Sequence, residues 1–428
     1  MSEGLFELEG DVPAEPSKVG RSHRLLRRAL VRQLQRIEHG ALTLQDPLFE
    51  GGAAIRFGDP SAREEARIFV RSPRFYWALA ARGAVGGAES YIDGEWATDD
   101  LAAVIRVLAR NAAIVESFNG GLARVARSGL QLFHRFNRNT RSGSRRNIAA
   151  HYDLGDDFYS LFLDPTLTYS SGIFERPDAT MEEASIAKYD RLCRKLDLSA
   201  SDHVLEIGTG WGGFAIHAAR TTGCRVTTTT ISENQFAVAS RRVADAGLTD
   251  RIEVCLRDYR DLTGTYDKLV SIEMIEAVGA DYLEEFFGVC DERLSDDGVM
   301  ALQAITIPDR HFDAHCKTVD FIKRYIFPGG NLVSTGAIGH AAAESGELRV
   351  THLEDLGPHY AETLRRWRED FTQNLSQIAA LGFDTRFQRM WEFYLCYCEG
   401  GFDERQIGLA QVVLEKSATR RPSLLGAL

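Results

Sequence analysis

The chain has 428 residues, of which 44% are hydrophobic and 26% are charged, and its formal net charge is −11. This length favours two domains, and the balanced composition excludes a chain that is disordered throughout. No apolar run reaches the roughly 18 residues that span a bilayer, and the negative charge disfavours binding of nucleic acid by the molecule as a whole.

The N-terminal segment, residues 1–18, is acidic and proline-containing and has no signal-peptide pattern, so we expect a loose tail and a cytoplasmic protein. Seven cysteines are scattered from Cys193 to Cys398 without a CxxC pair. This spacing argues against a disulfide framework and against a structural zinc site, and we expect no metal.

Residues 21–36 read RSHRLLRRALVRQLQR and contain six arginines but no acid. Leu26, Leu30 and Leu34 recur at helical spacing, which predicts a basic amphipathic helix. Such a helix can lie on anionic headgroups, and it can equally pack its apolar stripe against its own domain. The sequence leaves both interpretations open.

Residues 42–99 alternate short apolar runs with turn signals, a pattern that predicts strands with a few helices, and a helical stretch follows over 101–118. The next segment, 137–146, is polar and rich in arginine. We interpret it as an interdomain linker, with a contact to phosphate headgroups as the alternative. The predicted domains are therefore a smaller α+β domain at 1–140, for lipid or membrane association, and a catalytic domain at 141–428.

Beyond residue 187, apolar strands alternate with helical patterns. Strands are expected at 203–207, 225–230, 268–272 and 299–305, with one helix from Gly213 and another through Val243. This alternation predicts an α/β fold with a doubly wound, mostly parallel sheet.

A glycine-rich turn, Gly208–Gly213, follows the first of these strands and opens a helix. Glycines allow the backbone to approach a ligand at the carboxyl end of a strand. A dinucleotide site would need an acid at the end of the next strand, but that strand ends in Thr227–Thr230. The acid is instead Glu206, inside the first strand, which resembles the first motif of class I S-adenosylmethionine methyltransferases. A dehydrogenase is the alternative.

Further motifs surround this turn in a fixed order. They are HYDLGDDFY at 151–159, TYSS at 168–171, TISENQ at 230–235, RDYRDL at 257–262, IEMIEAVG at 272–279 and YIFPGG at 325–330. In this order and spacing the chain resembles the cyclopropane fatty acid synthases and the mycolic acid cyclopropane synthases, over about residues 145–415. Its N-terminal domain resembles that of the bacterial members that act on phospholipids.

The resemblance implies a class I, Rossmann-like methyltransferase that uses S-adenosylmethionine to convert the cis double bond of an unsaturated phospholipid acyl chain into a cyclopropane. It implies methyl transfer, a carbocation, and deprotonation by a bound bicarbonate ion. It also implies a homodimer in peripheral contact with the inner face of the membrane.

The resemblance carries site residues as well. The methionine part of the cofactor would contact Tyr169, Ser170, Gly208 and Gly210, the ribose Thr230 and Gln235, and the adenine Tyr259 and Arg260, while Glu206 would reach a ligand amino group or fix the glycine turn. The bicarbonate would be held by Glu276, Tyr360, Ser171, Gln303 and the backbone of Ile305.

Two of these positions depart from the commonest family pattern, because Ser171 stands where relatives often have Cys and Gln303 where they often have His. Both side chains can donate a hydrogen bond to an anion, but Gln cannot titrate. A non-cyclising transfer that gives a methyl-branched or methylene chain is therefore the alternative product. A methyltransferase for small molecules and an inactive lipid-binding protein are two further candidate functions. The aromatic segment 371–402 favours an acyl chain, and Glu276 with Tyr360 favours catalysis.

Overall fold

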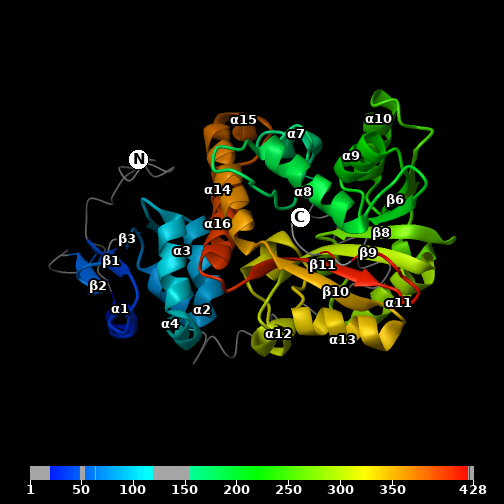
Figure 1. Ribbon diagram of the computed structural model, residues 1–428. Helices are drawn as coiled ribbons and strands as arrows, with labels where there is room; N and C mark the ends of the chain where they lie inside the picture. Colours follow the sequence, from blue (N-terminus) through cyan, green and yellow to red (C-terminus); the bar gives the residue numbers. More distant parts are fainter. Residues whose placement is uncertain (1–19, 49–53, 63, 119–153, 423, 425–428) are drawn as a thin grey trace. The chain divides into compact units, whose positions relative to one another are not determined.

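The computed structural model describes residues 20–48, 54–62, 64–118, 154–422 and 424 (Figure 1). The predicted tail, the Arg-rich segment 137–146 and the first three residues of the HYDLGDDFY motif lie outside these ranges. The chain forms two compact units. Unit 1 takes in Met1–Arg135, Thr318–Ile326 and Trp367–Gln406, and unit 2 takes in Phe136–Lys317, Phe327–Arg366 and Ile407–Leu428. Two segments from the range 141–428 are thus part of unit 1.

Unit 1 combines a small sheet with helices. The strand order is β2-β1-β3-β4, with β1 antiparallel to β2 and parallel to β3, and β3 antiparallel to β4. The strands are β1 (Ala41–Gln45), β2 (Ile55–Gly58), β3 (Glu65–Val70) and β4 (Trp96–Ala97). The helices are α1 (Arg21–Leu34), α2 (Arg74–Ile92), α3 (Leu101–Arg110), α4 (Ala112–Phe118), α15 (Leu375–Ala380) and α16 (Thr385–Asp403). The strands and helices predicted for residues 42–118 are confirmed.

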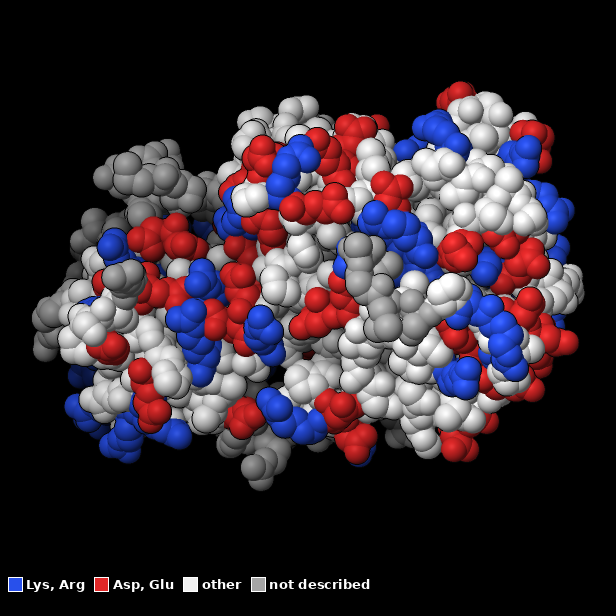
Figure 2. Space-filling view, in the orientation of Figure 1, with Lys and Arg blue, Asp and Glu red and all other residues white. Residues whose placement is uncertain are grey.

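Helix α1 confirms the predicted basic amphipathic helix. Leu30 and Leu34 are buried, so the apolar stripe packs within unit 1. Arg27 donates to Asp46 at 3.0 Å, whereas Arg24, Arg28 and other arginines of this helix are exposed. Figure 2 shows Lys and Arg side chains gathered over α1 at the lower left. The helix therefore has a basic outer face and an apolar inner face.

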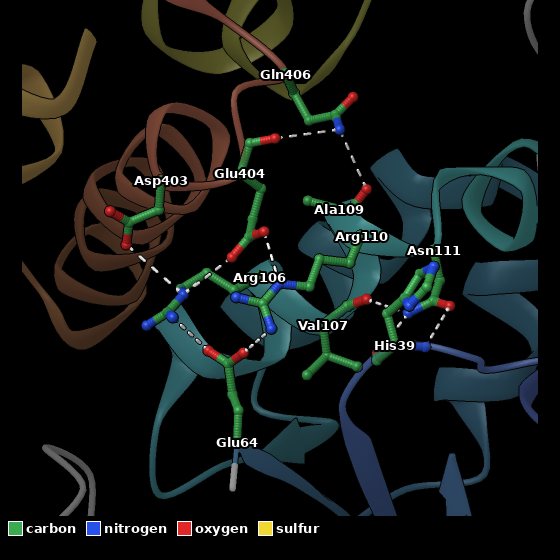
Figure 3. Close-up of polar contacts among 10 residues, drawn as sticks. All are labelled: His39, Glu64, Arg106, Val107, Ala109, Arg110, Asn111, Asp403, Glu404 and Gln406. Carbon is green, nitrogen blue, oxygen red and sulfur yellow. Dashed lines mark hydrogen bonds and ion pairs between the residues drawn. The ribbon is translucent and has the colours of Figure 1, made fainter. Parts of the chain in front are cut away.

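Ion pairs join the late segment 367–406 to the N-terminal part of unit 1 (Figure 3). Arg106 and Arg110 of α3 pair with Glu404 at 3.3 Å and 2.6 Å, and both arginines also pair with Glu64. On the same unit, the Tyr91 hydroxyl donates to Glu392 of α16 at 2.5 Å. Residues far apart in the sequence are thus joined by polar contacts within unit 1.

Unit 2 is built on a seven-stranded sheet with the order β10-β11-β9-β8-β5-β6-β7. Neighbours from β9 through β7 are parallel, and β11 is antiparallel to both β9 and β10. The strands are β5 (His203–Ile207), β6 (Arg225–Thr230), β7 (Ile252–Leu256), β8 (Tyr266–Ile272), β9 (Leu294–Thr306), β10 (Arg349–Asp355) and β11 (Gly408–Glu415). The predicted doubly wound, mostly parallel sheet is confirmed, and β5 and β6 have the predicted bounds.

Helices cover both faces of this sheet and form two hydrophobic clusters. One cluster joins the sheet to α11 (Leu283–Arg293) and α13 (Thr335–Ser345), and the other joins it to α8 (Met181–Leu196) and α9 (Gly213–Thr222). Further α-helices of the described ranges are α7 (Asp156–Tyr159), α10 (Glu233–Asp245), α12 (Asp309–Cys316) and α14 (Gly357–Gln373), the last of which belongs to unit 1 from Trp367 onward. Within the described ranges, no helix combines the length and hydrophobicity that a membrane crossing requires.

Candidate active site

Strand alternation decides which face of the sheet carries the polar candidates, because successive side chains point to opposite faces. Leu302 of β9 packs into the cluster with α11 and α13, whereas Ala301 packs into the cluster with α8 and α9. Gln303 therefore faces α8. The same alternation in β5, where Val204 belongs to the α8 cluster, turns Glu206 toward α8.

The glycine turn after β5 has a backbone that only glycine adopts without strain. Gly208 and Gly212 have φ angles of 103° and 86°, in the region that other residues rarely enter. A Cβ at Gly213 would lie 2.4 Å from the Tyr189 hydroxyl, whereas a Cβ at Gly210 would meet nothing within 4 Å. The turn is thus closely packed at its helix end and open at Gly210, where a ligand can approach the backbone.

Glu206 lies beneath this turn and is bonded to the neighbouring strand. The Thr228 hydroxyl of β6 donates to its carboxylate at 2.6 Å, and the same hydroxyl lies 2.7 Å from that of Thr209. Burial raises the pKa of Glu206 to about 8, and the opposing charge of Lys188 limits the rise. Two roles were considered for Glu206. Its contact with Thr228, which also contacts Thr209 of the turn, supports the role of fixing the turn.

The residues expected to hold the ribose and the adenine follow β6 and β7. The Thr230 hydroxyl donates to Gln235 at 2.8 Å. Arg260 is paired with Asp258 at 2.7 Å, and the Tyr259 ring packs edge-on against Phe286 with 5.5 Å between ring centres. Parallel strands bring these carboxyl ends to the edge that carries the glycine turn.

The segment expected to contact the methionine part of the cofactor contains Tyr169 and Ser170. The Tyr169 ring lies 5.2 Å from that of Tyr159. Ser170 accepts a 2.6 Å hydrogen bond from Nζ of Lys188, a fully buried residue of α8. Burial lowers the pKa of Lys188 to about 8, against the nearby charges of Glu273, Asp164 and Glu206. Lys188 was not predicted as a site residue, because a lysine within a mixed helix has no distinguishing pattern in the sequence.

Glu273 is the centre of the second group of candidates, although no role was predicted for it. Its carboxylate accepts three hydrogen bonds: from the Tyr360 hydroxyl at 2.6 Å, from the Gln303 amide at 2.7 Å and from the Ser171 backbone N–H at 3.0 Å. The residue directly follows β8, at the sheet edge where open α/β folds bind ligands. That position was the signal that could have found it.

Glu276 lies three residues further on and has a different environment. The Ile305 backbone N–H donates to Oε1 at 2.5 Å, while Oε2 is buried without a hydrogen-bond partner. Burial, together with the charge of Glu273, raises the pKa of Glu276 to about 8. Burial also raises the pKa of Glu273, but Tyr360, Lys188, Gln303 and Ser171 oppose that rise. Hydrogen bonds thus counter the effect of burial at Glu273 more than at Glu276, so Glu276 binds a proton more readily than Glu273 does.

A line of buried amides extends from Glu273 across the sheet. The side-chain amide of Gln411 on β11, paired in register with Gln303, donates to Oε1 of Gln303 at 2.8 Å. Nζ of Lys195 on α8 donates to Oε1 of Gln411 at 2.8 Å and to Glu354 at 2.7 Å. Each amide therefore accepts from the Lys195 side and donates toward Glu273, which fixes the orientation of Gln303.

The bicarbonate expected from the resemblance does not fit these residues. The donors assigned to it already have a carboxylate of the chain as partner, since Tyr360, Gln303 and the Ser171 N–H bind Glu273 and the Ile305 N–H binds Glu276. Among the assigned groups, Glu276 keeps one carboxylate oxygen, Oε2, without a partner. The Ser171 hydroxyl donates to the Gly172 carbonyl. A further anion beside Glu273 would meet like charge in a buried place.

Comparison with known proteins places this geometry in a family. The family described as mycolic acid cyclopropane synthetase matches residues 139–412. The chain is 39% identical over 378 residues to the tuberculostearic acid methyltransferase of Mycobacterium tuberculosis, with 86% of each chain covered. It is 34% identical over 375 residues to the cyclopropane-fatty-acyl-phospholipid synthase of Escherichia coli, with 86% of this chain and 91% of the relative covered.

The chain belongs to the mycolic acid cyclopropane synthetase family. Among solved structures, the cyclopropane synthase of Mycobacterium tuberculosis matches with a TM-score of 0.60 at 33% identity, over 64% of this chain and 98% of that one. A mycolic acid cyclopropane synthase solved with SAH and CTAB matches with the same score at 35% identity and the same coverage. The predicted class I methyltransferase fold and the S-adenosylmethionine-dependent activity are confirmed, and the dehydrogenase alternative is excluded.

Proposed function

We propose that this family member transfers the methyl group of S-adenosylmethionine to the cis double bond of an unsaturated phospholipid acyl chain at a membrane surface. The observation that carries the proposal is the buried carboxylate of Glu273, hydrogen-bonded to the backbone of Ser171 beside the predicted methionine-binding residues. The names of the relatives in Mycobacterium tuberculosis and Escherichia coli support a fatty acyl substrate.

The chemistry explains why such a site suits an alkene. S-adenosylmethionine supplies a methyl group on a positively charged sulfur, which an isolated double bond attacks only when the two are held in line at close range. The attack leaves a positive charge on the acyl chain. A fixed carboxylate and the face and hydroxyl of Tyr360 stabilise that charge, and burial keeps water away from it.

The same cation can give two products, and we propose the cyclopropane chain as the preferred one. Loss of a proton from the transferred methyl group closes the ring. The second candidate is a methyl-branched or methylene chain, which forms when the cation is quenched without ring closure. Two observations favour this second candidate: the 39% identity to a tuberculostearic acid methyltransferase, and the non-titrating Gln303 at the position where relatives often have His.

Mass spectrometry of the acyl chains tests both candidates. The purified protein is incubated with vesicles of unsaturated phospholipid and methyl-labelled S-adenosylmethionine. A gain of one CH₂ with loss of the double bond, and ring fragments on derivatisation, supports the cyclopropane. A gain of one carbon with unsaturation kept supports the branched alternative. The absence of labelled lipid would contradict the proposal.

We also propose a cytoplasmic protein that binds the inner face of the membrane and forms a homodimer. The exposed arginines of α1 support the membrane contact, because each basic residue near an anionic surface contributes up to about 1 kcal/mol. The homodimer and the assignment of residues 1–140 to membrane association rest on the resemblance. Light scattering of the purified protein tests the dimer.

A further inference from the structure

Glu273 occupies the position where the family resemblance would place a separate base. Three donors from three segments converge on its carboxylate, namely Tyr360 of α14, Gln303 of β9 and the Ser171 backbone. Hydrogen bonds to a charged acceptor are stronger than those to a neutral one, so this arrangement favours a charged carboxylate. The three hydrogen bonds therefore stabilise the ionised form of Glu273 against the effect of burial.

The backbone at Glu273 is strained, which indicates that the side chain serves a purpose. Its φ angle is 50°, in the left-handed region, where a side chain costs about 1–2 kcal/mol relative to glycine. The backbone N–H of Glu273 donates to the Gln303 carbonyl at 2.8 Å, which holds this conformation. Strain of this kind persists where the surrounding structure enforces it, and it is concentrated at functional sites.

The surrounding polar groups are arranged to receive a negative charge at Glu273. The amide line from Lys195 through Gln411 to Gln303 has all its donors directed toward Glu273. These three residues are fully buried. A neutral acid at Glu273 would weaken the last bond of the line, so the network and the carboxylate stabilise each other.

We propose that the Glu273 carboxylate is the general base of the reaction and takes the place of an external anion such as bicarbonate. This inference rests on the proposed function and deepens it. Glu273 is then a catalytic residue, and Gln303, Gln411 and Tyr360 position its carboxylate.

The π electrons of the alkene form the bond to the methyl carbon, and the carbon–sulfur bond breaks with its electron pair retained by sulfur. This leaves a cation on the second alkene carbon. An oxygen of Glu273 then accepts a proton from the transferred methyl group, and the electrons of that C–H bond form the bond that closes the ring. The carboxyl group later releases the proton to solvent.

The first test removes the basic carboxylate but keeps the size and shape of the side chain. Glu273→Gln should lower kcat by about 100-fold or more, as expected for the loss of a general base, with the affinity for S-adenosylmethionine unchanged. Glu284→Gln, the same exchange at an exposed position on α11 of the same unit, is the matched control. A Glu273→Gln variant with wild-type turnover would overturn the proposal.

The second test separates a catalytic from a structural role. The wild-type enzyme should work equally well in buffers stripped of carbon dioxide and in buffers with added bicarbonate. Glu273→Gly relieves the backbone strain and frees three donors, so bicarbonate or formate should restore part of its turnover. Dependence of the wild type on bicarbonate would overturn the proposal. The same holds for a folded, cofactor-binding Glu273→Gly variant that neither anion rescues, because the carboxylate would then be structural.

The wild-type enzyme distinguishes failure of the Glu273 assignment from failure of the proposed function. A wild-type enzyme that modifies lipid only when bicarbonate is added keeps the proposed function and loses the assignment of Glu273. A wild-type enzyme that labels no lipid in either buffer overturns both, since Glu273 would have no such reaction to serve.

Discussion

The two halves of the proposed site, one for the cofactor and one for the reaction, are built by different means. The cofactor half is a backbone structure, in which glycines with positive φ angles and the N–H groups of Gly208 and Thr209, both bonded to the Thr229 carbonyl at 3.0 Å, define the turn. The reaction half is a side-chain structure, in which Glu273 and Glu276 are each fixed by named donors. The cofactor half should therefore be sensitive to an added Cβ, and the reaction half to the loss of a single polar atom.

The largest effect is expected in the reaction half. Tyr360→Phe removes the hydroxyl that donates to Glu273 at 2.6 Å, and Glu276→Gln changes the buried acid beside it. Tyr360→Phe should lower kcat by about 100-fold, the scale seen when one aligned donor is removed from an active site. Glu276→Gln should also lower kcat, because an amide replaces the acid beside Glu273. In both variants the affinity for S-adenosylmethionine should stay close to that of the wild type. Steady-state kinetics with calorimetric binding measures both quantities. Near-normal lipid modification by both variants would contradict the assignment of this half.

The cofactor half should show the opposite split. Gly208→Ala introduces a side chain at a φ of 103° and 3.1 Å from Met274. An alanine at this φ angle strains the turn by about 1–2 kcal/mol. The turn has to adopt this strained conformation when the cofactor binds, so the affinity for the cofactor should fall about tenfold. Gly247→Ala, at a φ of 68° with nothing within 4 Å, is the matched control. Gly247→Ala should lower stability without lowering the affinity for the cofactor. Equal losses of affinity in both variants would show that the effect is not specific to the glycine turn.

A smaller effect, on the binding of membranes, is expected from the exposed arginines of α1, which belong to neither half of the site. Arg28→Gln on the exposed face of α1 should weaken binding to anionic vesicles by about fivefold at low salt, because one such charge contributes up to about 1 kcal/mol. The difference should vanish at high salt. Arg241→Gln, at an exposed position on α10, is the control. Sedimentation with vesicles measures the effect, and equal binding by both variants would exclude α1 as the contact.

The smallest predicted effect is a pH dependence of stability. Glu276 has a folded pKa of about 8, above the usual value of 4.5, so the folded state binds the extra proton between these values and stability falls as the pH rises through them. Glu276→Gln removes this term. Its Tm should be near that of the wild type at about pH 5 and a few degrees higher at about pH 9. Scanning calorimetry checks this, and a constant difference would mean that Glu276 titrates normally.

The strands and the glycine turn of the proposed cofactor half could be predicted from the sequence because their signals are local. Strand periodicity located β5 and β6, and the glycines marked a turn whose conformation follows from the residue type. The reaction half depends on sheet order, since Gln411 reaches Gln303 only because β11 lies between β9 and β10. Glu273 adds a second difficulty, because a non-glycine residue at positive φ has no signature in a sequence.

The left-handed backbone at Glu273 also bears on how such a site can arise. Glycine suits this conformation without strain, and the codons GGA and GGG for glycine differ from GAA and GAG for glutamate by one base. A single nucleotide change therefore exchanges a residue with a built-in carboxylate for one that leaves three hydrogen-bond donors open, and the main chain accepts both. An enzyme with this turn is therefore one point mutation away from a site that could use bicarbonate, formed from dissolved carbon dioxide, as its base.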